Sequence, residues 1–373
     1  MRFYDDLGRE FDHIFTPKKK MSLKYANVLE RIGIGEAKRA ERVKKCGTYF
    51  EVGLFSDGTA RLNKANFCKD PLCPQCSKRK SLKLFGQVSA CVDRLKADYK
   101  FIFVTLTIKN CAGSDLRRSC DLLQDAYIRL MDRKRMKFVQ GAFRALEITH
   151  DNNEYITKDM FYGNKAKHLK RREGYYKKLG LKIGDKNPNF DTFHPHLHII
   201  FAVPADYFET SDYLHQSELA ELWSDAVGLG YVPMVDIRAC KSKDKAIAEV
   251  VKLNSLDDFK YKDLVSAVAE VAKYSVKSSD FLSGTDDQNE ETVKSLLVAL
   301  RNRKMFQFYG VFRAVRKELK LDDVENGDLV HISDNSGKAQ LLAVLVFQWN
   351  DKLSSYIHTG VKVIDYEQIQ VKT

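Results

Sequence analysis

The segment FHPHLHIIFAV, residues 193–203, constrains the fold more than any other stretch of this chain. Its apolar content predicts a buried β-strand, and side chains along a strand alternate between the two faces of the sheet. His194, His196 and His198 therefore share one face, whereas the opposite face is wholly apolar. A rigid row of imidazoles is typical of a metal site, although a core strand whose histidines are merely hydrogen-bonded is the plainer alternative.

A carboxylate is expected to converge on these histidines. Two neutral imidazoles seldom complete a site for a hard divalent cation. In the predicted strand FRALEITH, residues 143–150, alternation places Glu147 on the polar face. If the two strands pair across the segment between them, Glu147 faces His196 and His198. Such a set suits Mg²⁺ or Mn²⁺ bound to a phosphate oxygen, and it would also accept zinc.

Four of the eight cysteines predict a second metal site, a structural zinc. Cys73 and Cys76 have the two-residue spacing of a zinc-binding loop, and Cys68 lies just before them. We expect Cys46 to be the fourth ligand, because the segments around the turn sequence SDG indicate a β-hairpin that returns the chain to it. Cys91 is the weaker candidate, since it falls in a predicted helix.

The remaining patterns predict an α+β fold. Apolar and β-branched runs indicate strands, and longer amphipathic runs between them indicate helices. The predicted strands are 100–109, 143–150, 193–203 and 231–240, and the predicted helices between them are 114–135 and 214–227. The order β-α-β-insertion-β-α-β is that of a ferredoxin-like split βαβ sheet.

The flanking segments complete the predicted organisation. Residues 1–20 are charged without a clear pattern and are expected to be mobile. Further expected elements are a basic helix at 22–45, a basic helical element for packing or DNA contact at 292–320, and a strand at 341–350. We divide the chain into an N-terminal basic helix and cysteine module (1–97), a central domain (98–282) and a C-terminal accessory region of helices and strands (283–373).

The insertion at residues 151–190 is long for a connection between two strands, which favours a functional role or mobility. It is basic and carries Tyr175 and Tyr176 among its charges. Such a segment could follow a nucleic-acid backbone and stack on bases, or it could be an ordinary solvated helix.

A net charge of +12 favours a polyanionic partner such as nucleic acid, although a basic soluble protein is the simpler explanation. No apolar run reaches the length of a membrane span, and the first residues lack the apolar core of a signal peptide. We therefore expect a soluble, intracellular protein.

A second group of polar residues lies in the segment 262–281, which we predict to be one amphipathic helix. Glu270, Tyr274 and Lys277 would lie opposite its apolar face, and a tyrosine used only for packing would not. Glu270 and Tyr274 are four residues apart and could act on one phosphate in turn. Lys273 and Lys277 would favour the phenolate form of the tyrosine. The alternative is a surface tyrosine among ordinary helix-surface charges.

In this order, these motifs resemble those of the plasmid rolling-circle replication initiators of the HUH endonuclease superfamily, in the single-tyrosine branch found on small plasmids of Gram-positive bacteria. The likeness covers most of the chain, from FCKDPLCPQCSKRKS to GVFRAVRKEL. The stretch FVTLTIKN at 103–110 matches the first family motif, His196-Leu197-His198 the metal motif, and Tyr274 the nucleophile motif.

The resemblance implies an HUH nuclease core and an origin-specific nickase. With a metal on His196, His198 and Glu147, Tyr274 would attack the scissile phosphodiester and form a 5′-phosphotyrosine. The free 3′-hydroxyl would prime rolling-circle synthesis. Glu270 occupies the position of the glutamate that activates water for the final cleavage.

The role of His194 stays open at this point, because a two-histidine motif does not require it. It could be a third ligand, a partner of the ligands, or a contact to a base. Lys273 is likewise a candidate neighbour of the site.

The resemblance also implies partners. These are plasmid origin DNA, as single-stranded hairpin and as duplex, and a host helicase and DNA polymerase in the bacterial cytoplasm. A homodimer is left open, and no membrane partner is expected. Two rival functions remain. One is a related HUH transposase or relaxase. The other is a non-catalytic, zinc-containing DNA-binding regulator, which would leave the histidine row unexplained.

Overall fold

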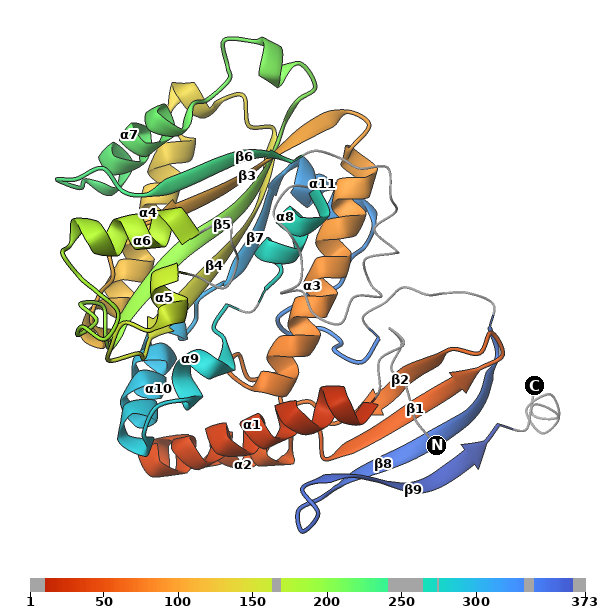
Figure 1. Ribbon diagram of the computed structural model, residues 1–373. Coiled ribbons are helices and arrows are strands. Elements are labelled where there is room, and N and C mark those ends of the chain that lie inside the picture. The colour runs from red at the N-terminus through yellow and green to blue at the C-terminus, as the bar shows by residue number, and fades with distance from the viewer. Residues whose placement is uncertain (1–10, 163–168, 241–263, 274, 332–338, 365–373) are drawn as a thin grey trace.

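The computed structural model describes residues 11–162, 169–240, 264–273, 275–331 and 339–364. In these residues the chain is an α+β protein with two antiparallel sheets (Figure 1). None of the described helices combines the length and the apolar character needed to cross a membrane.

The larger sheet has the strand order β6-β3-β5-β4-β7, and every neighbouring pair is antiparallel. Its strands are β3 (Tyr99–Thr107), β4 (Gly141–Asp151), β5 (Thr192–Pro204), β6 (Val235–Cys240) and β7 (Phe306–Gly310). The four strands predicted here are confirmed, and β7 is an addition at the edge.

Two strand–helix–strand units interlock in this sheet. Strands β3 and β4 both run antiparallel to β5, so they are parallel to each other, and α4 (Leu116–Met131) connects them. In the same way β5 and β6 lie on either side of β3 and are connected through α7 (Gln216–Val227). Each unit therefore holds one strand of the other between its own two strands.

Helices cover both faces of the larger sheet, which explains why β5 is apolar on two sides (Figure 1). On one face Leu197, Ile199 and Phe201 pack in a core with α4 and α7. On the other face Ile200 and Ala202 pack beneath three helices. These helices are α3 (Pro74–Leu95), α8 (Leu264–Val271) and α11 (Val311–Glu318). The histidine row lies on this second face, in continuation of Ile200.

The smaller sheet joins segments from the two ends of the chain. Its order is β2-β1-β8-β9, all antiparallel. The strands are β1 (Tyr49–Phe55), β2 (Ala60–Ala65), β8 (Leu341–Asn350) and β9 (Ser355–Val363). The predicted hairpin β1–β2 and the predicted strand at 341–350 are confirmed. Their pairing gives this sheet its own core, which includes Phe50, Phe347 and Tyr356.

Two sequence predictions about the N-terminal helices are corrected. Residues 11–20 are helical, since α1 (Phe11–Ile32) begins within the segment expected to be mobile. The predicted single helix at 22–45 is divided into α1 and α2 (Ala37–Lys45), because Gly33 adopts a φ of 111° that ends the first helix.

The segment 292–320 is not wholly helical. It contains the end of α10 (Asp286–Leu300), then β7, then α11. Phe306 and Phe308 pack toward the second face of the sheet, whereas Gln307 accepts hydrogen bonds from Arg144. This alternation has the two-residue period of a strand. The segment pairs as β7 with the edge of β4 that β5 leaves free.

The described part of the insertion forms two short helices, α5 (Lys158–Tyr162) and α6 (Leu169–Lys178), with a small core of their own. Tyr176 is buried and its ring stacks on Phe161 at 5.6 Å. Tyr175 stays 45% exposed. Of the two tyrosines, only Tyr175 has a ring available to a partner.

Candidate functional site

The register between β4 and β5 brings the predicted acidic residue to the histidine row. Glu147 lies directly opposite His196. Its Oε2 atom lies 3.0 Å from Nε2 of His198 and 3.4 Å from Nε2 of His196. The two Nε2 atoms are themselves 3.1 Å apart. All three side chains are buried, with residue exposures of 7 to 8%.

Both imidazoles are oriented by their other nitrogen. Nδ1 of His198 lies 3.1 Å from Oγ1 of Thr105 on the neighbouring strand. Nδ1 of His196 lies 3.0 Å from the carbonyl oxygen of His194. If each Nδ1 carries the proton, it donates to that oxygen and leaves Nε2 as a lone-pair donor, as in metal sites generally.

The electrostatics of the group favour an ionised carboxylate. Burial alone would raise the pKa of Glu147, but hydrogen bonds and charge from His196 and His198 hold the pKa of this carboxyl well below its usual range. Burial would lower the pKa of His196, but Glu147 outweighs it and raises this pKa. Two imidazole nitrogens and one carboxylate oxygen, all within 4.8 Å of one another, fit a divalent metal ion.

Glu270 reaches this group from α8. Its Oε1 atom lies 3.8 Å from Nε2 of His198, and its Oε2 atom forms an ion pair with Nζ of Lys273 at 2.5 Å. Both side chains of this ion pair are nearly nine-tenths buried. The structure therefore brings Glu270 and Lys273 to the site.

The predicted helix at 262–281 is wrong as a continuous element. Residues 262 and 263 lie outside the described residues; α8 ends at Val271, and α9 (Ser278–Leu282) begins only at Ser278. Between them the carbonyl of Ser275 accepts a hydrogen bond of 2.8 Å from the backbone N–H of Ile148, which draws the chain alongside β4. The helical spacing assumed for Glu270 and Tyr274 therefore does not apply. Tyr274 itself lies outside the described residues.

Two further predicted residues do not belong to the group of converging ligand atoms. Lys277 lines a cavity with Lys18 and Met21 of α1, and no contact with the metal-binding group is found for it among the described residues. His194 stacks on the ring of His196 at 5.1 Å but does not belong to the group of converging ligand atoms. Burial, assisted by His196, lowers the pKa of His194 to about 4.

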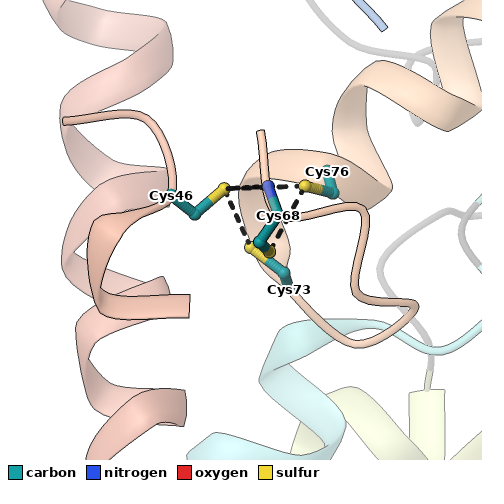
Figure 2. Close-up of side chains that lie close together, drawn as sticks. All are labelled: Cys46, Cys68, Cys73 and Cys76. Carbon is teal, nitrogen blue, oxygen red and sulfur yellow. Dashed lines mark hydrogen bonds between the residues drawn. The ribbon is translucent and has the colours of Figure 1, made fainter. Parts of the chain in front are cut away.

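The four predicted cysteines meet at one point (Figure 2). Cys46 ends α2, Cys73 immediately precedes α3 and Cys76 lies in its first turn. The Sγ atom of Cys46 is 3.5 Å from that of Cys76 and 3.6 Å from that of Cys73. The Sγ atom of Cys68 is 3.7 Å from that of Cys76. Cys91 lies apart, on the buried face of α3 near its C-terminal end.

Backbone groups are arranged for thiolates at this site. The N–H of Lys69 points to Sγ of Cys76 at 3.2 Å, and the N–H of Cys68 points to Sγ of Cys46 at 3.4 Å. Lys69 has a φ of 58°, which a non-glycine residue adopts only at some cost. Four converging sulfurs with N–H donors fit a closed tetrahedral metal site.

Sequence reasoning missed Lys19, which is fully buried beside the cysteine cluster. Its Nζ atom donates to the carbonyls of Lys44 and Cys46, the latter at 2.8 Å. Burial lowers the pKa of Lys19, while the charges of Cys46 and Cys73 oppose this shift. No signal in the sequence distinguishes it from Lys18 and Lys20 on either side.

We expect Lys19→Met to weaken metal binding at the cysteine cluster about 10- to 100-fold, as removal of such supporting groups does elsewhere. The substitution leaves two carbonyls at the end of α2 without this donor, and it removes a buried cation whose charge acts on Cys46 and Cys73. A competition titration with a chromophoric zinc chelator measures the change. Lys20→Met on the exposed side of α1 is the matched control. Equal affinities in the two variants would contradict this role.

Helix α3 connects the two candidate metal centres. It starts at the cysteine cluster, and its later residues, including Leu84, Phe85 and Val88, are buried against the larger sheet. The hydroxyl of Ser81 donates to the carbonyl of Ala272, two residues after Glu270. Displacement of the start of α3 would therefore also displace the segment that carries Glu270, through the bond between Ser81 and Ala272.

A cavity of about 380 Å³ opens between the cysteine segment, the residues after α8 and the turn before β7. Its described lining is strongly basic: Lys69, Lys80, Lys273, Arg303 and Lys304. Glu325 is the one acidic residue in the described lining. Its carboxylate already accepts a hydrogen bond from the backbone N–H of Met305. Such a lining suits the phosphates of a nucleic acid.

Comparisons with known proteins agree with a role in DNA replication. The sequence is 30% identical over 358 residues to the Protein rep of Streptococcus pneumoniae serotype 2 (strain D39 / NCTC 7466), covering 94% of each chain. It is 31% identical over 345 residues to the Protein rep of Bacillus amyloliquefaciens, covering 90% of each chain. No solved structure matches the chain. A family model described as "Replication protein" matches residues 59–357. The chain therefore belongs to the replication protein family.

Proposed function

We propose that this protein is a plasmid rolling-circle replication initiator, a metal-dependent nickase that cuts one strand of its origin. The observation that carries the proposal is the register of β4 and β5, which sets Glu147 opposite His196 and converges three ligand atoms beside Glu270. The interlocked strand order supports a ferredoxin-like HUH core beneath this group.

Glu147, His196 and His198 would hold the catalytic Mg²⁺ or Mn²⁺. When bound, this ion would polarise the scissile phosphodiester and neutralise charge on its oxygens. Lys273 pairs with Glu270, so it orients that carboxylate. Lys277 would favour the phenolate form of Tyr274 rather than bind the metal, and its own side chain lines a cavity with Lys18 and Met21.

Tyr274 is the proposed nucleophile. It lies outside the described residues, and the placement of its neighbours supports the assignment. Lys273 is paired with Glu270, and Ser275 is bonded to Ile148, one residue beyond Glu147. The phenolate oxygen attacks phosphorus, the bond to the 3′ oxygen breaks, and that oxygen takes up a proton. The products are a 5′-phosphotyrosine and a 3′-hydroxyl that primes synthesis.

Glu270 is the proposed general base of the final cleavage. It would accept a proton from water, whose oxygen would attack the phosphorus of the phosphotyrosine; the bond to the tyrosine oxygen would break, and that oxygen would take up the proton, which releases the DNA after one round. A carboxylate in this role yields hydrolysis, whereas a second tyrosine would yield another covalent adduct.

The cysteine cluster would hold a structural zinc, and the basic cavity beside it would take the backbone of the bound strand. Origin DNA is thus the proposed substrate. A bacterial cytoplasmic location and work with a host helicase and DNA polymerase follow from this function.

A cleavage assay tests the proposal. The full chain is incubated with a single-stranded origin oligonucleotide from the same replicon, with Mn²⁺, with Mg²⁺ or with EDTA, and the products are separated on denaturing gels. We expect a covalent protein–DNA band and a shortened strand, both of which require the metal. Specific binding without cleavage under either metal would refute the nickase and favour a DNA-binding regulator.

A further inference from the structure

A third cavity, of about 310 Å³, continues the polar face of the sheet beyond the candidate catalytic metal centre. Glu147 and His196 form one cross-strand pair of β4 and β5, and Thr149 and His194 form the next pair on the same face; each such pair is here called a row of the sheet. Asp151, one row further, also lines the cavity. Successive rows on one face are about 7 Å apart. The cavity therefore begins one row from the proposed position of the reacting phosphate.

The insertion supplies the outer part of this cavity. Asn153 comes from its first residues and Met160 from α5, while Asn110 comes from the segment after β3. The side-chain amide of Asn110 donates to Oγ1 of Thr192 at 2.8 Å, so the residue is held in place. His150, which also borders the cavity, is fixed through both ring nitrogens, by Asp191 and by the carbonyl of Asp280, each at 3.0 Å.

The chemistry of the lining indicates which part of a nucleotide would bind. The described lining residues include no lysine or arginine, in contrast to the basic cavity described above, and Asp151 contributes a carboxylate. A carboxylate repels a phosphate, but it accepts hydrogen bonds from the amino group of a base. The imidazole of His194 and the thioether of Met160 offer surfaces against which a flat ring can pack.

We infer that this cavity is a nucleobase subsite, which receives the base next to the cleaved phosphate and prefers a base with an exocyclic amino group. The inference rests on the proposed nickase function and deepens it. The volume equals about ten water molecules, which is room enough for one heterocyclic base. The subsite assigns a role to His194, which packs against the base, and to the start of the insertion, which forms part of the pocket wall.

Asp151 is the residue that discriminates between bases. One of its oxygens, Oδ1, accepts a hydrogen bond from the N–H of Asn153 at 3.2 Å. The rest of the carboxylate can accept from the exocyclic amino group of adenine (at C6), cytosine (at C4) or guanine (at C2), whereas thymine has no exocyclic amino group. Asp151→Asn keeps the shape and the turn and adds an amide donor, so it should admit thymine.

The test compares origin oligonucleotides that differ in the base at each position around the cleavage site. Initial cleavage rates give kcat/KM for each, and fluorescence anisotropy without divalent ions gives binding independently of cleavage. In the wild-type protein we expect thymine to be disfavoured about tenfold at one position adjacent to the nick. In Asp151→Asn this preference should shrink to about twofold, with all other positions unchanged. Asp125→Asn is the matched control, because Asp125 is exposed on α4, which covers the opposite face of the sheet. This variant should keep the wild-type preferences.

The outcomes separate this inference from the function on which it rests. A wild-type enzyme that cleaves, with the same base preferences in Asp151→Asn as in the control, would overturn the subsite and leave the nickase intact. A wild-type protein that shows neither cleavage nor base preference would overturn the proposed function, and the subsite with it. A change confined to one position beside the nick supports the subsite.

Discussion

Tyr274→Phe will bind origin DNA but form no covalent protein–DNA product. The substitution removes one oxygen, the atom proposed to attack phosphorus, and leaves the proposed metal ligands Glu147, His196 and His198 in place. Loss of a nucleophile typically lowers the rate by a factor on the order of 10⁴ or more. Denaturing gels with end-labelled oligonucleotides measure the covalent band, and anisotropy measures binding, which should stay within about twofold of the wild-type value.

A companion variant distinguishes the nucleophile from the base. Glu270→Ala should still form the covalent band, because its proposed role comes in the final cleavage, but the band should persist instead of turning over. Tyr309→Phe is the control for tyrosine removal, since Tyr309 is 61% exposed on the edge strand β7. A covalent band of normal yield in Tyr274→Phe would refute the assignment of the nucleophile.

Cys73→Ser will lower the free energy of unfolding by about 5 kcal/mol or more and abolish stoichiometric zinc binding. Binding energy at a closed structural zinc site is folding energy, and loss of such a site is among the largest single-residue effects. Cys73 is fully buried at the start of α3. Elemental analysis of the purified protein and chemical denaturation measure the two effects. Origin cleavage should fall as well, because α3 carries the contact between Ser81 and Ala272.

Cys111→Ser is the matched control for this experiment. Cys111 is a half-buried thiol outside the cysteine cluster, so its replacement should leave the zinc content unchanged and alter stability little. If Cys73→Ser retained zinc and wild-type stability, the cluster would not be a structural metal site.

Much of the larger sheet could be predicted from the sequence, because its strands carry local signals. The histidine strand and FRALEITH both show the two-residue period of a strand, and that period alone places His196, His198 and Glu147 on polar faces. Cysteine spacing likewise indicated Cys68, Cys73 and Cys76 as a group. In each case the information lies within a few neighbouring residues.

Predictions that depended on long-range contacts were less accurate. The helix expected at 262–281 ends at Val271, and four residues later the carbonyl of Ser275 accepts a hydrogen bond from the N–H of Ile148 on β4 instead of from a following helical turn. The aromatic segment that forms β7 is predicted as helix from its sequence. Its strand structure depends on pairing with the free edge of β4, which lies far away in the chain. Lys19 could not be singled out among three consecutive lysines, since only packing against α2 and the cysteines distinguishes it.

The sequence by itself therefore determined the chemistry available to this protein: a histidine row, an acidic partner on a second strand, and a cysteine set. Side-chain alternation and ligand spacing are local properties, so they can be read without a fold. Only the tertiary structure decided which of these groups meet. The register of β4 and β5 selects Glu147, the contact of Glu270 with His198 joins a distant helix to the site, and the sheet row beyond His196 creates the cavity at His194. These arrangements depend on strand pairing and helix packing between residues far apart in the chain, for which local patterns carry no information.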